Sequence, residues 1–222
     1  MVVERKFVEE GIRRMELEQF LAKEFAKAGY SHCDIQRTPL STRIIVFATR
    51  PGMIIGRGGR NIDIITERIK KEFGIDNPQL DIREVEVPEL DPNVVASQIA
   101  FSLERGANYI RLANIWMQRI MEAGAVGVQI KISGKLGGEM ARTEKFSSGY
   151  LKHTGEPAEE LVKKGFAVAL TKPGVIGVEV KILTRLPKEL EISRKLEGGA
   201  DGDTQDEGDK GDEEGGSSEE TE

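Results

Sequence analysis

Apolar residues recur every three or four positions in residues 60–73, the spacing that places side chains on one face of an α-helix. That stripe consists of Ile62, Ile65, Ile69 and Phe73. A longer helix is predicted for residues 4–28, with Gly29 as its stop. Its apolar residues close to one face are Val8, Ile12, Met15, Ala22 and Phe25.

Between these two helices the pattern changes to that of strands. Residues 31–37 alternate apolar and polar positions, and residues 43–49 form a more apolar run. Pro51 suits the first turn of a short helix. A third strand is predicted for residues 80–87. The predicted order is therefore helix, two strands, two helices and a strand.

A glycine-rich turn joins the two later helices of this series. It reads Gly56-Arg57-Gly58-Gly59-Arg60, with Ile54 and Ile55 before it and Ile62 after it. Glycine lets another backbone approach closely, and the start of a helix favours phosphate. A plain turn between two core helices is the alternative. The flanking residues and the following helix favour a loop that resembles the G-x-x-G loop of K-homology (KH) domains, which clamps about four nucleotides of single-stranded RNA. The element order is similar to that of type II KH domains.

Prolines interrupt the chain at residues 88–92, which we take as a domain boundary. Asp91 is placed to cap the next helix and Pro92 to begin it. Two helices follow, at residues 93–105 and 108–123. The core stripe of the second is expected to be Ile110, Ala113, Met117 and Ile120. Trp116 is expected in the core or at a protein interface rather than stacked on a base.

Strands follow these helices. Residues 126–133 and 176–182 alternate in the manner of half-buried strands, and another strand is predicted at residues 166–171. The intervening residues 134–165 are expected to hold short strands and long loops. The fold class is α+β, with two helices on a mostly antiparallel sheet. We predict a KH domain at residues 1–88, an RNA-binding α+β domain at 93–190 and a disordered acidic tail at 191–222.

The net charge of −6 is divided unevenly along the chain. Residues 197–222 hold 12 of the 38 acidic residues and one of the 32 basic residues, which leaves 31 bases and 26 acids in residues 1–196. A basic body suits phosphate binding, and a tail of Gly, Asp, Glu and Ser cannot bury apolar area.

Few residues are available for metal or redox chemistry. The single cysteine, Cys33, cannot form an intramolecular disulfide, and only His32 and His153 accompany it. We expect Cys33 to be a buried strand residue, and we expect no metal site and no cofactor. No apolar run approaches the roughly 20 residues that span a bilayer. The chain is therefore expected to be soluble and cytoplasmic, without a membrane partner.

A second glycine-rich stretch carries cations. Lys135 and Arg142 flank Gly137-Gly138, and Lys131 and Lys145 lie on the adjoining segments. Cations on flexible loops suit folded RNA, where contacts to phosphates and 2′-hydroxyls dominate. An ordinary solvated loop is the alternative. Leu136 stands where a nucleotide-binding P-loop requires Ser or Thr, so that class of site is disfavoured.

Three segments, in this order, resemble the universal S three family of small-ribosomal-subunit proteins, and the acidic tail resembles that of its archaeal branch. They are the glycine loop within its type II order, Ser133–Gly138 with Ala141–Glu144, and Gly174–Lys181. The resemblance implies a structural part of the small-subunit head that binds ribosomal RNA, contacts neighbouring head proteins and helps form the mRNA entry channel. It implies no homo-oligomer and no enzymatic activity. Arg111 matches a basic position of a helix implicated in opening mRNA, but Ile110 and Asn114 stand where further bases are expected.

Two other functions compete with this interpretation. A free KH-domain regulator of mRNA is consistent with the first domain alone, although regulators usually contain several KH units. A nuclease is disfavoured because no acidic cluster suggests a two-metal site. A lysine-based lyase stays open, since one buried lysine suffices for such chemistry.

Overall fold

The computed structural model describes residues 2–38, 41–75 and 77–186. The chain divides into residues 1–185 and residues 186–222. The predicted acidic tail lies outside the described residues. The boundaries predicted near residues 88–93 and 190 stay predictions.

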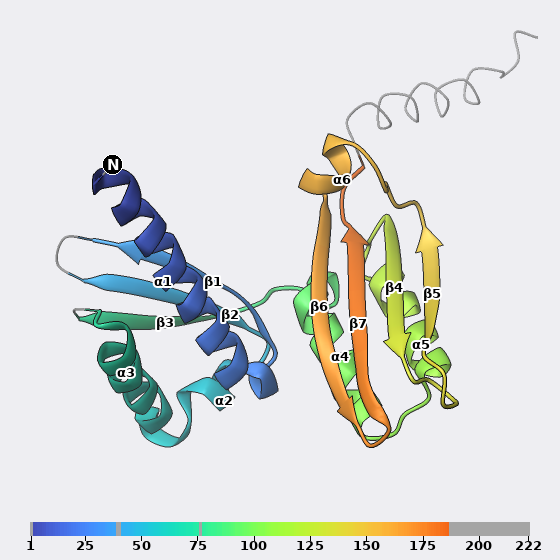
Figure 1. Ribbon diagram of the computed structural model, residues 1–222, viewed down its shortest axis with the longest axis horizontal. Coiled ribbons are helices and arrows are strands. Elements are labelled where there is room, and N and C mark those ends of the chain that lie inside the picture. Colours follow the sequence, from blue (N-terminus) through green and yellow to red (C-terminus); the bar gives the residue numbers. More distant parts are fainter. Residues whose placement is uncertain (1, 39–40, 76, 187–222) are drawn as a thin grey trace, which may run out of the picture. The chain divides into compact units, whose positions relative to one another are not determined.

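The first half has the element order predicted from the sequence (Figure 1). Its elements are α1 (Val2–Glu24), β1 (Tyr30–Arg37), β2 (Thr42–Ala48), α2 (Pro51–Ile55), α3 (Arg60–Phe73) and β3 (Pro78–Glu84). A short 3₁₀ turn, Ala26–Ala28, links α1 to Gly29, which is left-handed as expected of a helix stop. Strand β2 is central, antiparallel to β1 and parallel to β3.

One face of this three-stranded sheet packs against the helices. The buried residues of β2 on that face are Ile44, Val46 and Ala48, and α3 contributes Ile65 and Ile69. Cys33 is buried in β1, as predicted. Of the predicted α3 stripe, Ile65 and Ile69 are buried and Phe73 packs against the same core, whereas Ile62 is half-buried.

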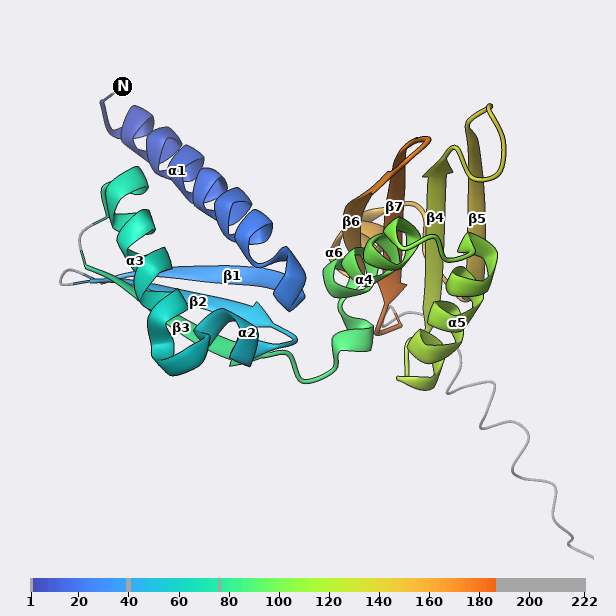
Figure 2. The same ribbon diagram turned by 90° about the horizontal axis from the view of Figure 1, so that it is seen from below.

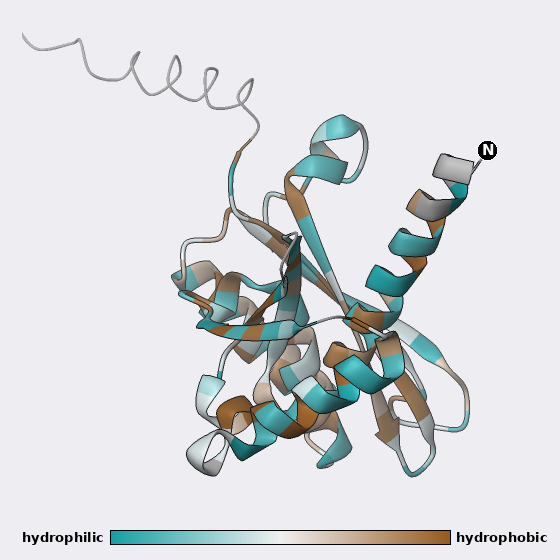
Figure 3. Cartoon of the chain, turned by 90° about the vertical axis from the view of Figure 1, so that its left-hand side faces the viewer, coloured by the Kyte–Doolittle hydropathy of each residue, from teal (hydrophilic) through white to brown (hydrophobic). Residues whose placement is uncertain are grey.

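The apolar stripe predicted for α1 is wrong in its first half. Val8, Ile12 and Met15 are exposed, whereas Leu17, Leu21 and Phe25 supply the buried contacts. In Figure 3 the turns of α1 near the N label carry both hydrophilic and hydrophobic residues. Only the later turns of α1 belong to the core, so periodicity identified a helix but not which part of it is covered.

The second half begins with a capped helix and ends in a sheet. Its elements are α4 (Pro92–Glu104), α5 (Tyr109–Glu122), β4 (Gly127–Gly134), β5 (Arg142–Gly149), α6 (Glu156–Glu160), β6 (Val162–Thr171) and β7 (Gly174–Leu183). The 3₁₀ turn Pro88–Leu90 precedes α4. Asp91 caps α4 as predicted, its carboxylate accepting a hydrogen bond from the Asn93 N–H at 3.2 Å.

The second sheet has the strand order β5-β4-β7-β6, with every neighbouring pair antiparallel. Helices α4 and α5 lie on one face of this sheet (Figures 1 and 2). Alternate residues of the central strands, such as Ile130 and Val180, pack against the helices in one core. The α+β fold predicted from the sequence is confirmed.

Two details of the second half differ from prediction. Ile110 is exposed rather than part of the α5 core stripe, which runs through Ala113, Trp116 and Ile120. Trp116 is buried in the core, which is one of the two positions expected for it. Residues 134–165 are more ordered than expected, because β5 is a full strand of eight residues, α6 follows it and β6 begins at Val162.

Candidate nucleic-acid interface

The glycine loop is built from backbone conformations that other residues adopt only under strain. Gly56, Gly58 and Gly59 all have positive φ, at 71°, 66° and 79°. A Cβ on Gly56 would lie 2.6 Å from the Asn61 side chain, so this position is closed by packing. A Cβ on Gly58 or Gly59 would meet no described atom within 4 Å. The end of the loop next to α3 therefore leaves its backbone open to a ligand.

The start of α3 adds a favourable potential for an anion. Gly59 occupies the N-cap position and has no side chain to cap the first N–H groups of this 14-residue helix. Arg60, the first residue of α3, is exposed beside them. Asp63 in the first turn partly offsets this positive potential. The Arg57 side chain lies outside the described part of the structure.

Exposed apolar side chains lie close to the loop in sequence, and their exposure was not predicted from the sequence. Met53 and Ile55 are exposed in α2, and Ile64 is exposed in α3. Their exposure places apolar surface next to backbone donors and a cation. This combination suits the bases and the phosphates of a single strand. The position of Ile64 could have predicted its exposure, because this residue lies off the buried stripe of its own helix.

In the second half, two predicted lysines lie side by side. Lys131 of β4 is paired in register with Lys145 of β5, so both side chains project from the same, outer face of the sheet. Lys131 also lies 3.4 Å from a carboxylate oxygen of Glu179 on β7, and Lys181 lies 3.1 Å from the other. These contacts reduce the charge that Lys131 offers to RNA, whereas Lys145 is exposed.

The lysines on either side of Glu179 alter its ionisation. Partial burial alone would raise the pKa of this carboxyl, but hydrogen bonds and charge attraction from Lys181 and Lys131 outweigh burial and lower it. The carboxylate therefore stays ionised between its two partners.

Lys135 and Arg142 are brought to one end of the second sheet. Gly134 ends β4 and pairs with Arg142, the first residue of β5, and Lys135 follows directly in the connection. Gly134 has a φ of 149° and is closely approached by the backbone of Val175 and Ile176. The glycine therefore fixes the position where the cationic connection begins.

Arg111 is not part of this cluster. It is exposed on α5, which packs on the inner face of the sheet, whereas Lys131 and Lys145 project from the outer face. Trp116, on the same helix, is only 9% exposed, and the Arg119 guanidinium lies 5.2 Å from its ring centre. The tryptophan is therefore a core residue whose ring is covered by a cation.

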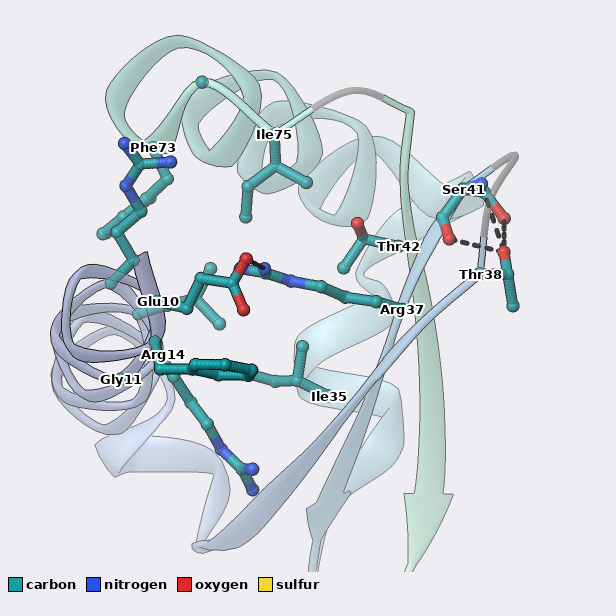
Figure 4. Close-up of a pocket in the computed structure, with 14 residues that line it drawn as sticks. Glu10, Gly11, Arg14, Ile35, Arg37, Thr38, Ser41, Thr42, Phe73 and Ile75 are labelled. Carbon is teal, nitrogen blue, oxygen red and sulfur yellow. Dashed lines mark hydrogen bonds and ion pairs between the residues drawn. The ribbon is translucent and has the colours of Figure 1, made fainter. Parts of the chain in front are cut away.

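A separate pocket of about 660 Å³ lies beside α1. Figure 4 shows Glu10 of α1 reaching Arg37 of β1 across it, with their charged atoms 3.1 Å apart. Ile35, Phe73 and Ile75 supply apolar walls. The glycine loop does not contribute to its lining, so this pocket and the candidate RNA-binding loop are distinct.

Neither a metal centre nor a membrane span is found in residues 2–38, 41–75 and 77–186. No group of three or more His, Cys, Asp or Glu side chains there is arranged to hold a metal ion. None of the helices in these ranges is long and apolar enough to cross a membrane.

Comparison with known proteins decides the family. Residues 16–90 match the model of the KH domain, and residues 99–182 match the model described as "Ribosomal protein S3, C-terminal domain". A relative from Methanocaldococcus jannaschii, named small ribosomal subunit protein uS3, is 53% identical over 199 residues, which cover 88% of this chain and 96% of the relative. The chain belongs to the uS3 family. Its resemblance to this family, inferred from three sequence segments, is confirmed.

Two further uS3 relatives are also archaeal. The protein of Archaeoglobus fulgidus is 48% identical over 195 residues, covering 86% of this chain and 85% of that protein. The protein of Methanobrevibacter smithii is 47% identical over 194 residues, covering 86% of this chain and 78% of its own length. The match to the second, ribosomal domain argues against a free KH regulator, because a KH match alone is all that such a regulator requires.

Proposed function

We propose that this chain is a structural, non-enzymatic component of the small ribosomal subunit head. The observation that carries the proposal is the order of its two family matches, a KH domain followed by the C-terminal domain of a ribosomal protein. A KH loop alone is shared by many RNA-binding proteins, whereas the second match is specific. In this role the chain binds ribosomal RNA, contacts neighbouring head proteins, helps form the mRNA entry channel and acts in the cytoplasm.

Within that role, the glycine loop binds a single-stranded segment of RNA by its backbone. Three features support this: the open backbone at Gly58 and Gly59, the uncapped start of α3, and the exposed Arg60. We assign Gly56 and Arg57 to the same loop, Gly56 as the residue that shapes it. The exposed Ile55 and Ile64 offer surface to the bases.

A second contact with folded ribosomal RNA uses the cations of the second sheet. Lys135 and Arg142 at the end of β4 and β5 are its centre, with Lys145 on the outer face of β5. Lys131 contributes less, because Glu179 holds its ammonium. Arg111 on α5 is proposed as a separate contact at the mRNA entrance.

Sedimentation of the native chain tests the ribosomal role. In a sucrose gradient of cell lysate at moderate salt, the chain is expected with the small subunit at about one copy per particle. A chain that stays at the top of the gradient would instead support a free RNA-binding regulator.

The loop is tested with a matched pair of glycine substitutions in the full chain. Gly58→Asp places a negative charge where a phosphate is expected, at φ 66° and with open space around it. Gly74→Asp introduces the same residue at φ 60°, also in open space, at the far end of α3. Binding to a short single-stranded RNA should weaken about tenfold or more for Gly58→Asp and little for Gly74→Asp. Equal binding by both variants would exclude the loop as the contact.

The second contact is tested by its salt dependence. Replacing Lys135 and Arg142 together with Ala should weaken binding to folded ribosomal RNA. It should also reduce the slope of log K against log salt by about 1 for each phosphate that the two side chains neutralise. Lys163→Ala, on β6, is the control. An unchanged slope in the double variant would show that these cations do not contact phosphates.

A further inference from the structure

The pocket beside α1 lies between that helix, strands β1 and β2, and the end of α3. Its lining includes Phe73 and Gly74 at the C-terminal end of α3, whereas the glycine loop lies before Arg60 at the other end. Neither of the RNA contacts proposed above uses this pocket. Its residues therefore require an explanation of their own.

The walls of the pocket are apolar and fixed in position. They are formed by Ile35 of β1 and by Phe73 and Ile75 at the end of α3. The Phe73 ring packs edge-to-face against Phe20 of α1, with the ring centroids 5.7 Å apart, so the core holds this ring in place. In Figure 4 the Arg37 side chain crosses the pocket with Ile35 on one side and Ile75 on the other. A flat apolar group fits between walls of this kind.

Cations surround these walls. The arginines Arg13, Arg14 and Arg37 line the pocket, against a single carboxylate, that of Glu10. Arg37 lies 3.1 Å from Glu10, and Arg14 lies 3.1 Å from Glu18 on its own helix. Arg13 forms no ion pair with any residue that the structure describes. The pocket therefore has an excess of positive charge and suits an anionic group.

Gly11 leaves space on the helix side of the pocket. This residue lines the pocket from the interior of α1, where glycine destabilises a helix relative to alanine. A Cβ on Gly11 would meet no described atom within 4 Å, so packing within the described chain does not require glycine here. A glycine at such a position lets a ligand approach the backbone closely.

These features match the chemistry of a nucleotide that is unstacked from its strand. Such a nucleotide joins a flat base to an anionic phosphate. The base fits between Ile35 and Ile75 and can stack on the guanidinium plane of Arg37. The phosphate can then pair with Arg13 and Arg14. The pocket volume of about 660 Å³ is large enough for one nucleotide.

We propose that this pocket binds one unstacked nucleotide of ribosomal RNA, with its base against the apolar walls and its phosphate at the arginines. This inference rests on the proposed ribosomal function, which brings RNA to the chain. It adds a contact that takes up a single base, separate from the glycine loop, which clamps the backbone of a strand.

Titration of the free full-length chain with the four nucleoside 5′-monophosphates tests the pocket directly. The amide NMR signals of Ile35 and Ile75 should shift and saturate with at least one of them. Adenosine alone and inorganic phosphate alone should shift these signals much less at the same concentration, because each offers only half of the ligand. Saturation by inorganic phosphate alone, or no shift with any nucleotide, would overturn the proposal. The signals of Gly58 and Gly59 report binding at the glycine loop separately.

Filling the pocket separates ligand binding from stability. Gly11→Leu places a better helix former in open space beside the apolar walls, so it should raise the melting temperature by about 2–4 °C. The same side chain should weaken nucleotide binding about tenfold or more, because it occupies the pocket. Gly138→Leu, also in open space but in the β4–β5 connection, should bind the nucleotide as wild type does. Unchanged nucleotide affinity in Gly11→Leu would contradict the proposal.

The ion pair across the pocket provides a test with the opposite sign. Glu10→Gln removes a carboxylate that opposes the phosphate, so nucleotide affinity should rise about threefold, whereas Arg37→Gln should lower it about fivefold. The matched pair is Asp81→Asn and Arg43→Gln, which changes an ion pair of 2.7 Å on the other face of the same sheet. Both of these variants should bind as wild type. Equal effects of the two pairs would show that the nucleotide does not bind in the pocket.

Crosslinking in assembled subunits identifies the ligand as ribosomal RNA. The photoreactive residue p-benzoylphenylalanine replaces Phe7, which is 70% exposed and lines the pocket. Small subunits are reconstituted with the full chain, isolated by sedimentation, irradiated and analysed by mass spectrometry. Position 7 is expected to crosslink to ribosomal RNA, and Gly11→Leu in the same chain should abolish that crosslink.

Several outcomes of this experiment would overturn the proposal. They are a crosslink from position 7 to a protein, the absence of any crosslink in subunits that contain the chain, and an RNA crosslink that persists in Gly11→Leu, since RNA would then pass over the pocket without entering it. If the wild-type chain does not sediment with the small subunit, the proposed ribosomal function fails instead. The sedimentation step therefore distinguishes the two failures.

Discussion

Gly56 and Asn61 fill adjoining space in the glycine loop, with the Asn61 Nδ2 atom 2.6 Å from where a Gly56 Cβ would lie. The backbone of Gly56 also has φ 71° and ψ −174°, a region that only glycine occupies readily. Gly56 therefore shapes the loop, whereas Gly58 and Gly59 leave it open.

This difference predicts unequal costs for two alanine substitutions. Gly56→Ala should lower the free energy of unfolding by about 2–4 kcal/mol, because backbone strain adds to the clash with Asn61. Gly58→Ala should cost about 1 kcal/mol, because its φ of 66° is strained but its surroundings are open. Urea denaturation followed by circular dichroism measures both. Adding Asn61→Ala to Gly56→Ala should recover only the part of the cost due to the clash, and a full recovery would show that the backbone is not strained.

The ion pairs of Glu179 predict a dependence of stability on pH. Because the folded chain lowers the pKa of Glu179, its ion pairs stabilise the fold at pH values above the ordinary glutamate pKa of 4.5. That contribution is lost as the pH falls through the lowered value. At pH 7, Glu179→Gln should reduce the free energy of unfolding by up to about 1 kcal/mol, since these pairs are partly exposed.

At a pH below the folded-state pKa, wild type and Glu179→Gln should become equally stable. Glu139→Gln, in the exposed β4–β5 connection, serves as the control, and its free energy of unfolding should change little at either pH.

Glu179→Gln also releases Lys131 and Lys181, so the affinity of this variant for ribosomal RNA at low salt should rise. A fall in affinity would show that the carboxylate positions these lysines rather than competing with RNA for them.

Close packing at Gly165 predicts a large effect from one methyl group. A Cβ on this residue of β6 would overlap the Pro92 carbonyl group at the start of α4 and lie 2.6 Å from the Asn93 nitrogen. Backbone atoms cannot rotate away as side chains do, so Gly165→Ala should cost about 1–3 kcal/mol or more. Gly138→Ala, with no described atom within 4 Å, should be neutral or slightly stabilising. Thermal unfolding compares the two, and similar melting temperatures would contradict the close packing of α4 on β6.

Much of the fold was predictable because it depends on patterns among residues that are close in sequence. The stripe of α3, the cap at Asp91 and the alternation of β4 and β7 each depend on residues close in sequence. The exposure of Val8 and Ile12 was not predictable, because it depends on which turns of α1 the core covers. The spacing of apolar residues indicates which face of a helix is buried, but not how many of its turns the rest of the core covers.

The candidate site shows the same division. The glycine loop could be located from its spacing, because its backbone conformations require glycine at those positions. The partial neutralisation of Lys131 could not, because Glu179 lies 48 residues away in sequence and is brought opposite only by strand register. The exposure of Phe166, Val168 and Leu170 likewise depends on which face of β6 the helices cover, and the sequence does not determine that face.

The burial of the single tryptophan predicts a large loss of stability when its side chain is removed. Trp116 is 9% exposed and packs in the core between the helices and the second sheet, so its removal should leave a cavity. Trp116→Ala should lower the free energy of unfolding by about 3–5 kcal/mol. Phe101→Ala, at a position 50% exposed on α4, should cost less than about 1 kcal/mol. Urea denaturation monitored by circular dichroism compares the variants.

Under conditions where Trp116→Ala remains folded, its affinity for single-stranded RNA should equal that of wild type, because the ring lies in the core and not on the RNA-binding surface. A loss of affinity without a loss of stability would instead assign the ring to RNA stacking.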